Sequence, residues 1–337
     1  MLRVFPPRFW WQERSILSTC LMPLGWCFGM ASMLSQRLHK VQQAPHPVLC
    51  IGNAVVGGSG KTPLAIALNH LLRRKGYRPV FLTRGYGGKY HQPCRVDLAH
   101  HTAIDVGDEA LLLARHAPTW VGGNRATSAM RARHDGDCYI MDDGMQHPSL
   151  KRDITLLAIN PHQGVGNHAI MPAGPLREPW AYALAKTQAI VMVEQKKNKK
   201  KPPLPPLLHH VTKKPLPIFR ATATLDDTQL KNKGSRPLIA FAAIAPPHNF
   251  FEMIQDATPS PIIAHYAYPD HAVLTKKQLD LMLNDATQKK ATLVTTEKDF
   301  VRLPRAYQSS IMPVALRLHI HQEDALLDFV LSSLAQL

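Results

Sequence analysis

The feature that most constrains this chain is the segment from Val48 to Thr62, which reads VLCIGNAVVGGSGKT. An apolar run ends in a glycine-rich loop, and Lys61 and Thr62 then open an amphipathic segment. Glycines let successive backbone N–H groups turn inward around phosphate oxygens, and the N-terminus of the following helix adds partial positive charge. Lys61 is expected to reach the β- and γ-phosphates of a nucleoside triphosphate, and the Thr62 hydroxyl to ligate Mg²⁺. The predicted nucleotide-binding residues are Val55, Val56, Gly57, Gly58, Ser59, Gly60, Lys61 and Thr62.

This loop departs from the strict phosphate-loop pattern, because Val55 stands where a glycine is usual, five residues before Gly60. A flexible glycine-rich turn with no ligand is the alternative interpretation. The order of apolar strand, GKT and helix favours the nucleotide site, since that is the context which the binding mechanism requires.

Length and composition narrow the class of protein. A chain of 337 residues with 45% hydrophobic and 19% charged residues has room for two globular domains and is not typical of a disordered protein. Five cysteines without CxxC spacing indicate reduced thiols in a cytosolic compartment and no zinc site. The formal net charge of +16 predicts an anionic partner: nucleic acid, anionic lipid or a phosphorylated substrate. No RNA- or DNA-binding motif is present in the sequence, so a nucleic-acid partner is not expected.

The first forty residues predict contact with a membrane. Phe9, Trp10 and Trp11 follow two arginines, and Ser15–Gln36 then runs without a charged residue. A spanning helix needs about 20 apolar residues, but serines, glycines and Pro23 dilute this segment. The aromatic and basic flanks favour a helix that lies in the membrane interface; a true membrane span and a buried core helix are the alternatives. A secretory signal is disfavoured, because it requires a small-residue cleavage site and export-type cysteine use.

From Val48 onward, short apolar runs alternate with helical segments. This order predicts an α/β P-loop core with a mostly parallel sheet covered on both faces, and ligands at the carboxyl ends of the strands. A smaller C-terminal α/β domain follows, in which Thr275 and Gln278 form a capping box. With the N-terminal membrane-associated helix, these units make up the expected fold. The expected strands are Val48–Gly52, Pro79–Thr83, Tyr139–Met141, Ile154–Ile159, Ala189–Val193, Leu238–Ile244, Pro261–Tyr266, Thr292–Thr295 and Val314–Leu318, and helices are expected at 62–75, 108–116, 125–134, 275–282 and 324–334.

Composition divides the chain into four parts: a membrane-associating segment at 1–45, the P-loop core at 46–194, a linker at 195–236 and the smaller domain at 237–337. The linker prediction rests on the runs KKNKKK and PPLPP, because like charges and prolines resist core packing. The lysines of this segment are either a solvated surface or a contact for anionic lipid.

Two adjacent carboxylates, Asp142 and Asp143, end the apolar stretch CYIMDDG. In a P-loop protein, an acid at the end of a strand near the glycine loop holds Mg²⁺ directly or through water. Successive strand residues point in opposite directions, so the two carboxylates can share a metal only where the strand has ended and the chain turns. An ordinary Asp-Asp-Gly turn is the alternative, but the GKT loop earlier in the chain favours metal binding.

Other polar groups follow other predicted strands. Asp108 precedes a helical segment, where it acts either as a helix cap or as a carboxylate that orients or deprotonates an attacking hydroxyl; the residues alone leave both open. Arg84 and Tyr86 in the turn TRGYGG suit a phosphate or a sugar. Asp270 and His271 form a candidate acid–base pair across an interdomain cleft, although one histidine among 18 is more often structural.

Taken in order, these motifs resemble those of the tetraacyldisaccharide 4'-kinase family, lipid kinases that act late in lipid A assembly. The resemblance covers nearly the full chain, and that family is similar in lacking the glycine which Val55 replaces. The matching stretches are GNAVVGGSGKTP (Gly52–Pro63), TRGYGG (Thr83–Gly88), GDEALLLA (Gly107–Ala114), GGNR (Gly122–Arg125), DDGMQH (Asp142–His147), RDI (Arg152–Ile154), MPAGPLREP (Met171–Pro179), PDH (Pro269–His271) and TTEKD (Thr295–Asp299).

The resemblance implies transfer of a phosphate from ATP to the 4'-hydroxyl of a tetraacylated glucosamine disaccharide 1-phosphate. It places the protein on the cytoplasmic face of the bacterial inner membrane, as a peripheral or monotopic protein on an anionic membrane surface. ATP and Mg²⁺ are the implied cofactors, and the lipid disaccharide is the implied partner. The implied catalytic residues are Asp108, His271 and Lys61, the Mg²⁺ ligands are Thr62, Asp142, Asp143 and Glu178, and the substrate-binding residues are Tyr86, Arg125 and Arg177.

Two stretches differ from the family pattern. The run AFAAIAPP (Ala240–Pro247) replaces the usual AFAGIGNP, and Ala110 follows GDE where proline is usual. The alanines put the conformation of that loop in question, because alanine accepts positive φ less readily than glycine. The alternatives to a lipid kinase are a P-loop transferase or NTPase with a small soluble substrate and a nucleotide-switched membrane adaptor.

Overall fold

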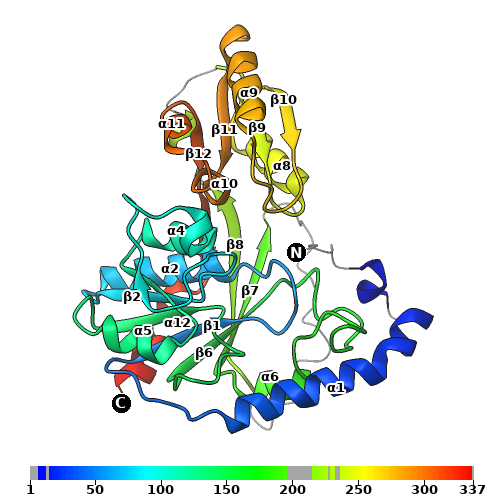
Figure 1. Cartoon of the computed structure of the whole chain (residues 1–337), viewed down its shortest axis with the longest axis vertical. Coiled ribbons are helices and arrows are strands. Elements are labelled where there is room, and N and C mark those ends of the chain that lie inside the picture. The colour runs from blue at the N-terminus through cyan, green and yellow to red at the C-terminus, as the bar shows by residue number, and fades with distance from the viewer. Residues whose placement is uncertain (1–6, 13–14, 196–214, 227, 232–235, 336–337) are drawn as a thin grey trace.

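The larger of two α/β domains is built on a sheet of mostly parallel strands (Figure 1). The computed structural model describes residues 7–12, 15–195, 215–226, 228–231 and 236–335. Within them the large sheet has nine strands in the order β13-β8-β7-β6-β1-β5-β2-β4-β3. All neighbouring pairs are parallel except β13 with β8 and β3 with β4. The strands are β1 (Val48–Gly52), β2 (Pro79–Thr83), β3 (Cys94–Arg95), β4 (Thr119–Val121), β5 (Cys138–Asp142), β6 (Ile154–Ile159), β7 (Ala189–Gln195), β8 (Ile218–Leu225) and β13 (Leu316–Ile320).

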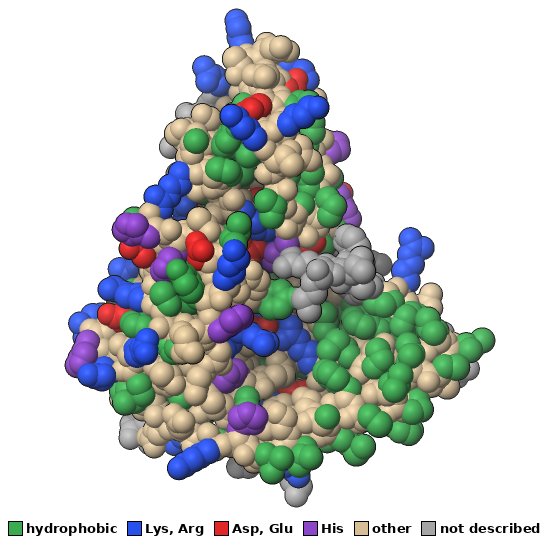
Figure 2. Space-filling view, in the orientation of Figure 1, with side chains coloured by type: hydrophobic (Ala, Val, Ile, Leu, Met, Phe, Trp, Pro, Cys, Tyr) green, Lys and Arg blue, Asp and Glu red, His purple; other side chains and the backbone are tan. Residues whose placement is uncertain are grey.

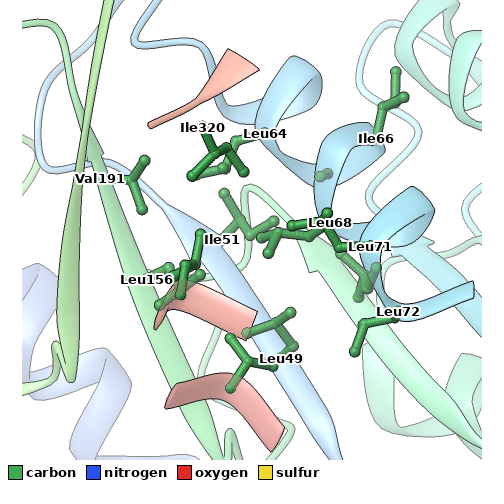
Figure 3. Close-up of a cluster of buried hydrophobic side chains, with 14 of the residues drawn as sticks. Leu49, Ile51, Leu64, Ile66, Leu68, Leu71, Leu72, Leu156, Val191 and Ile320 are labelled. Atoms are coloured by element: carbon green, nitrogen blue, oxygen red, sulfur yellow. The ribbon is translucent and has the colours of Figure 1, made fainter. Parts of the chain in front are cut away.

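Helices cover both faces of this sheet, as the continuous apolar runs predicted. One face packs against α2, α4 and α12. Figure 3 shows leucines of α2, among them Leu64 and Leu68, beside Ile51 of β1. The other face packs against α5 and α6, where Tyr139 and Met141 of β5 are completely buried. The helices of this domain are α2 (Lys61–Arg74), α3 (Ala103–Val106), α4 (Asp108–Ala114), α5 (Arg125–Arg131), α6 (Trp180–Ala185) and α12 (Glu323–Ala335).

The smaller domain contains a four-stranded parallel sheet in the order β10-β9-β11-β12. One side packs against α8 through Phe250 and Ile254, and the other packs against α9 through Leu279 and Met282. The capping box of Thr275 and Gln278 forms as predicted. The elements are α7 (Thr228–Lys231), β9 (Leu238–Ala242), α8 (Pro247–Ala257), β10 (Ile262–Ala267), α9 (Lys276–Gln288), β11 (Thr292–Thr296), α10 (Glu297–Phe300), α11 (Arg305–Gln308) and β12 (Met312–Val314).

The structure corrects the predicted domain boundaries at two places. Strand β8 lies inside the predicted linker 195–236, yet it pairs with β7 and β13 in the large sheet. The chain then returns from the small domain, so β13 and α12 belong to the large domain and not to the predicted unit 237–337. The single strand predicted at Val314–Leu318 is therefore two strands in two sheets, β12 and β13. The lysine- and proline-rich run at 196–214, on which the linker prediction rested, lies outside the described residues.

Helix α1 (Ile16–Leu38) follows a short 3-10 helix, η1 (Arg8–Trp11), and runs along the lower edge of the large domain (Figure 1). Gly25 and Gly29 face the domain, where a Cβ on Gly25 would lie 2.6 Å from the carbonyl oxygen of Ile170. Ser18 also donates a hydrogen bond to the Ala173 carbonyl at 2.8 Å. Only 17% of the most apolar 18-residue stretch of α1 is buried, which contradicts the alternative of a buried core helix.

Candidate functional site

The glycine loop joins β1 to α2 at the carboxyl edge of the large sheet. Gly60, the N-cap of α2, has φ of 78°, and a Cβ there would lie 2.7 Å from Cγ1 of Val193. Only glycine satisfies both the left-handed backbone and this close approach without strain. The preceding residues are fixed by the backbone: Asn53 Nδ2 donates to the Val55 carbonyl at 2.6 Å, and the Val56 N–H donates to Pro175 at 2.8 Å. Val55 is thus a buried support of the loop.

The acidic end of β5 lies directly beside this loop. Thr62 Oγ1 donates a 2.8 Å hydrogen bond to Asp142 Oδ2, while Asp142 Oδ1 is buried with no hydrogen-bond partner among the described residues. Asp143 follows the end of β5 and has φ of 50°, so the chain turns there. Because of this turn, both carboxylates can face the loop. Lys61 Nζ lies 3.4 Å from Asp143 Oδ1, and Arg177 donates to the same carboxylate at 2.9 Å.

Burial and charge shift the pKa values of these groups in different directions. Burial raises the pKa of Asp142 to about 7, and the nearby Glu109 and Asp143 carboxylates add to the rise. Burial would also raise the pKa of Asp143, but Lys61 and Arg177 outweigh it and hold that pKa below its usual value. Burial lowers the pKa of Lys61 despite the neighbouring Asp143. The site thus holds an incompletely compensated carboxylate, Asp142, close to the partly desolvated ammonium group of Lys61.

The second half of the site joins the two domains. Asp108 is the first residue of α4, and its Oδ2 lies 2.7 Å from Nδ1 of His271, which follows β10 in the small domain. His271 has φ of 58°, a strained conformation that clusters at functional sites. Gly107 before Asp108 is required by sterics, because its φ is 86° and a Cβ would lie 2.5 Å from the Tyr86 carbonyl oxygen. The structure therefore brings Asp108 and His271 together, as the resemblance implied.

Three charged residues of this half were not assigned from the sequence. Arg302 Nη2 lies 2.6 Å from Asp108 Oδ2, and Lys298 Nζ lies 3.2 Å from Glu109 Oε1. Burial would raise the pKa of Asp108, but the hydrogen bond from His271 and the charges of Lys298 and Arg302 hold it well below its usual range. Lys298 lies within the TTEKD motif, and the i,i+4 spacing to Arg302 places the two on one face of a helical turn. That spacing is the signal by which a sequence could have indicated them.

Glu109 connects the two halves. It follows Asp108 directly, pairs with Lys298, and is close enough to contribute to the pKa shifts of Lys61 and Asp142. The phosphate-loop lysine, the buried Asp142 carboxylate and the Asp108–His271 pair therefore belong to one charged region between the domains.

Glu178 is held by protein donors and has no direct contact with Thr62, Asp142 or Asp143 among the hydrogen bonds of the described residues. Its side chain is fully buried, with Oε2 2.5 Å from Lys186 Nζ and hydrogen bonds from Gln36 and Gln146. Every carboxylate oxygen is thus occupied by a protein donor, and no group of three His, Cys, Asp or Glu side chains suited to a metal is found among the described residues. Glu178 thus forms a buried ion pair in this structure, and its role as a metal ligand stays a prediction.

The predicted substrate-binding residues differ in exposure. Arg125 is 2% exposed and donates to the carbonyls of Gly122 and Gly123, while its buried Nε has no partner among the described residues. Burial, with Arg84 nearby, lowers its pKa to about 10. Tyr86 is 55% exposed, and Arg177 is bound to Asp143.

The AFAAIAPP stretch does not adopt a glycine-like conformation. Among the described non-glycine residues, positive φ occurs at Asp143, His168, His271 and Lys290, so none of these alanines is strained. The backbone of Ala243 instead supports the site, because its carbonyl accepts from the His271 N–H at 2.8 Å.

The fold and the site together define a P-loop protein in which a second domain contributes charged residues to the site. The family model described as "Tetraacyldisaccharide-1-P 4'-kinase" matches residues 17–335, and the chain belongs to this family. The Methylobacterium nodulans "Tetraacyldisaccharide 4'-kinase" is 40% identical over 324 residues, which is 95% of this chain and 93% of that protein. The protein of the same name from Gluconobacter oxydans is 38% identical over 316 residues, 93% of each chain.

A solved structure has the same fold. The crystal structure of "apo" form LpxK from Aquifex aeolicus, in complex with ATP, superposes with a TM-score of 0.73 at 22% sequence identity. The match covers 95% of this chain and all of that one. At this identity the likeness establishes the architecture of both domains.

Proposed function

We propose that this chain is an ATP-dependent kinase that phosphorylates the 4'-hydroxyl of a tetraacyldisaccharide 1-phosphate in lipid A biosynthesis. The proposal rests on a phosphate loop together with the Asp108–His271 pair, whose neighbour Glu109 acts electrostatically on Lys61 of the loop. A phosphate loop alone supports any NTPase. A buried carboxylate paired with histidine on the facing domain adds a place for an acceptor hydroxyl, and membership of the family supports the identity of that acceptor.

The residues at the loop fit a nucleotide with its magnesium ion. Asp142 Oδ1 is a buried carboxylate oxygen with no partner in the described structure, and it adjoins the Thr62 hydroxyl. Hard oxygen donors of this kind are what Mg²⁺ prefers, so Thr62 and Asp142 would hold the ion, with Asp143 close by. When bound, Mg²⁺ neutralises charge on the β- and γ-phosphates. Lys61, now beside Asp143, would contact the same phosphates.

Transfer would then depend on positioning. The Asp108 carboxylate accepts the proton of the 4'-hydroxyl as the hydroxyl oxygen forms its bond to the γ-phosphorus. The bond from that phosphorus to the β–γ bridging oxygen breaks, and ADP leaves with the electron pair. Phosphoryl transfer proceeds mainly through orientation and charge stabilisation, so an ionised, fixed carboxylate is suited to this role.

The exposed apolar side of helix α1 favours a substrate that lies in a membrane. It is the one helix among the described residues that is long and apolar enough to cross a membrane. One side packs on the domain through Gly25 and Gly29, whereas Trp26, Met30 and Leu34 are 63%, 60% and 58% exposed. Hydrophobic side chains cover the lower right of the molecule, where α1 runs (Figure 2). Because one side of the helix is occupied by protein, we propose that α1 lies in the interface of the inner membrane on its cytoplasmic face.

Activity is tested with radiolabelled ATP, Mg²⁺ and the disaccharide lipid in mixed micelles. Asp108→Asn should lower kcat by about 10²- to 10⁴-fold, the range for a lost proton acceptor, and Lys61→Ala should abolish detectable transfer. Lys75→Ala, at the exposed far end of α2, is the matched control and should behave as wild type. Normal turnover of Asp108→Asn would refute the assignment. ATP hydrolysis without labelled lipid would favour the nucleotide-switched adaptor.

Membrane binding is tested separately by flotation with vesicles that contain anionic phospholipid. Replacing Trp26 and Leu34 by serine should release the protein from the vesicles, because both apolar side chains lose their lipid contact. Met130→Ser, at a side chain 46% exposed on the large domain, should leave flotation unchanged. Equal flotation of the double variant and wild type would contradict the proposed role of α1.

A further inference from the structure

The guanidinium group of Arg302 contacts both members of the Asp108–His271 pair. Its Nε and Nη2 are 2.9 Å and 2.6 Å from Asp108 Oδ2, and Nη2 is also 3.2 Å from His271 Nδ1. The third nitrogen, Nη1, donates to Asp299 Oδ1 at 3.1 Å and to the Ala243 carbonyl at 3.3 Å. With 9% of its side chain exposed, Arg302 is a buried cation that touches the carboxylate assigned to accept the proton.

The small domain fixes this arginine. Asp299, which binds Nη1, is 3% exposed, and its other oxygen accepts hydrogen bonds from Thr296 Oγ1 at 2.8 Å and from the Ala243 N–H at 3.0 Å. A planar guanidinium held at one end presents its remaining N–H groups in a fixed direction, which an ammonium group cannot do. Asp108, in contrast, belongs to α4 of the large domain. The contact between Arg302 and Asp108 therefore joins the two domains.

The two carboxylate oxygens of Asp108 have different hydrogen-bond partners. Oδ2 is occupied by His271 and by two N–H groups of Arg302. Oδ1 accepts one hydrogen bond, from the N–H of Glu109 at 3.0 Å. Because a carboxylate oxygen has two lone pairs, Oδ1 retains one for a further donor. A hydroxyl of the acceptor would therefore meet Oδ1.

We propose that Arg302 is a positioning residue for phosphoryl transfer: it anchors Oδ2 of Asp108 from the small domain and leaves Oδ1 directed at the acceptor hydroxyl. This rests on the proposed function, in which Asp108 accepts the hydroxyl proton. The reactive arrangement of Asp108 then exists only while the small domain rests on the large one, because both His271 and Arg302 come from the small domain.

Arg302 also sets the charge around Asp108. The groups that face this carboxylate are His271, Arg302 and Lys298 from the small domain and Glu109 from its own helix, with Asp270 3.6 Å from the far nitrogen of His271. Removal of one buried cation from this set would raise the pKa of Asp108. The acid limb of the kcat profile, which reports protonation of the base in the ternary complex, would move to higher pH.

The test compares pH profiles of the full-length kinase. Arg302→Gln should lower kcat by at least about 10-fold near neutral pH, move the acid limb upward, and leave the KM for ATP within about twofold. Arg305→Gln is the matched control, because Arg305 also crosses between the domains but donates only to the carbonyls of Leu98 and Ala99. It should keep the wild-type profile. An acid limb of Arg302→Gln that coincides with those of wild type and control would overturn the proposal.

Arg302→Lys keeps the test decisive if the glutamine variant does not fold. Lysine retains the charge but lacks the planar fork, so kcat should fall while the acid limb stays in place. Wild-type kcat in Arg302→Lys would overturn the positioning role. Asp108→Asn separates the role of Asp108 from that of Arg302. If Asp108→Asn stays active, the proposed function of Asp108 fails. If Asp108→Asn is inactive but the pH profile of Arg302→Gln is unshifted, only the proposed role of Arg302 is refuted.

Discussion

Replacing Lys186 by methionine should destabilise the large domain by about 3 kcal/mol, because it leaves a buried carboxylate without its cation. Glu178 is fully buried, and its Oε2 lies 2.5 Å from Nζ of Lys186, whose side chain is 13% exposed. Breaking such a buried pair from one side typically costs about 3–5 kcal/mol. The lower end applies here, since hydrogen bonds from Gln36 at 3.2 Å and Gln146 at 3.1 Å remain.

Urea unfolding followed by tryptophan fluorescence measures this loss. The five tryptophans all precede residue 181, so the signal reports the large domain and its N-terminal helices and not the small domain. Lys151→Met is the matched control: its ammonium lies 3.9 Å from Asp153 and the side chain is 50% exposed. An ion pair at the 4 Å limit with a half-exposed lysine contributes about 1 kcal/mol or less.

The double replacement of Glu178 and Lys186 by methionine provides the second half of the test. Removing both charges should recover most of the lost stability, because apolar residues of similar volume often replace a buried ion pair at little cost. A loss for Lys186→Met no larger than that for Lys151→Met would refute the reasoning. So would a double variant as unstable as the single one, since the cost would then come from packing and not from the uncompensated charge.

Three further outcomes follow from the site and from α1. Gly60→Ala should weaken nucleotide binding measured by calorimetry, because the added Cβ would meet Val193 at 2.7 Å in a left-handed backbone; unchanged affinity would contradict the steric argument. The raised pKa of Asp142 means that the folded protein holds this proton more tightly than the unfolded chain does. The free energy of unfolding of the nucleotide-free protein should therefore fall as the pH rises from about 4 to about 7. Asp142→Asn should flatten that part of the curve of melting temperature against pH, and a variant curve parallel to wild type would refute the shift. Gly25→Leu should detach α1, because its Cβ would lie 2.6 Å from the Ile170 carbonyl oxygen, and limited proteolysis should then cleave the helix faster than in wild type.

The sequence was sufficient to predict local structure where that structure depends on residues that are adjacent in the chain. The phosphate loop is such a case, because the glycines, Lys61 and Thr62 follow one another between β1 and α2, and the helix begins at Lys61 as the motif predicted. The strands of the central sheet are a second case, because continuous apolar runs are typical of parallel strands buried on both faces.

The boundaries of the small domain could not be predicted in this way. The segment Ile218–Leu225 alternates buried and half-buried residues, but prolines beside it indicated a linker. The run Ile311–Leu316 is apolar without a break, so its composition does not mark the change from one sheet to the other at Ala315. Which sheet a strand joins depends on pairing with strands far away in the sequence, and β13 finds its partner β8 about ninety residues earlier.

The sequence by itself determined the class of this protein, because backbone conformation and local chemistry fix a phosphate loop within fifteen neighbouring residues. Only the tertiary structure decided what surrounds the reacting groups. It placed Arg302 against Asp108 at a separation of 194 residues and paired Glu178 with Lys186. The physical reason is that a buried charge must find compensation, and whether a cation, a metal ion or a hydrogen-bond donor supplies it depends on which elements the fold brings together.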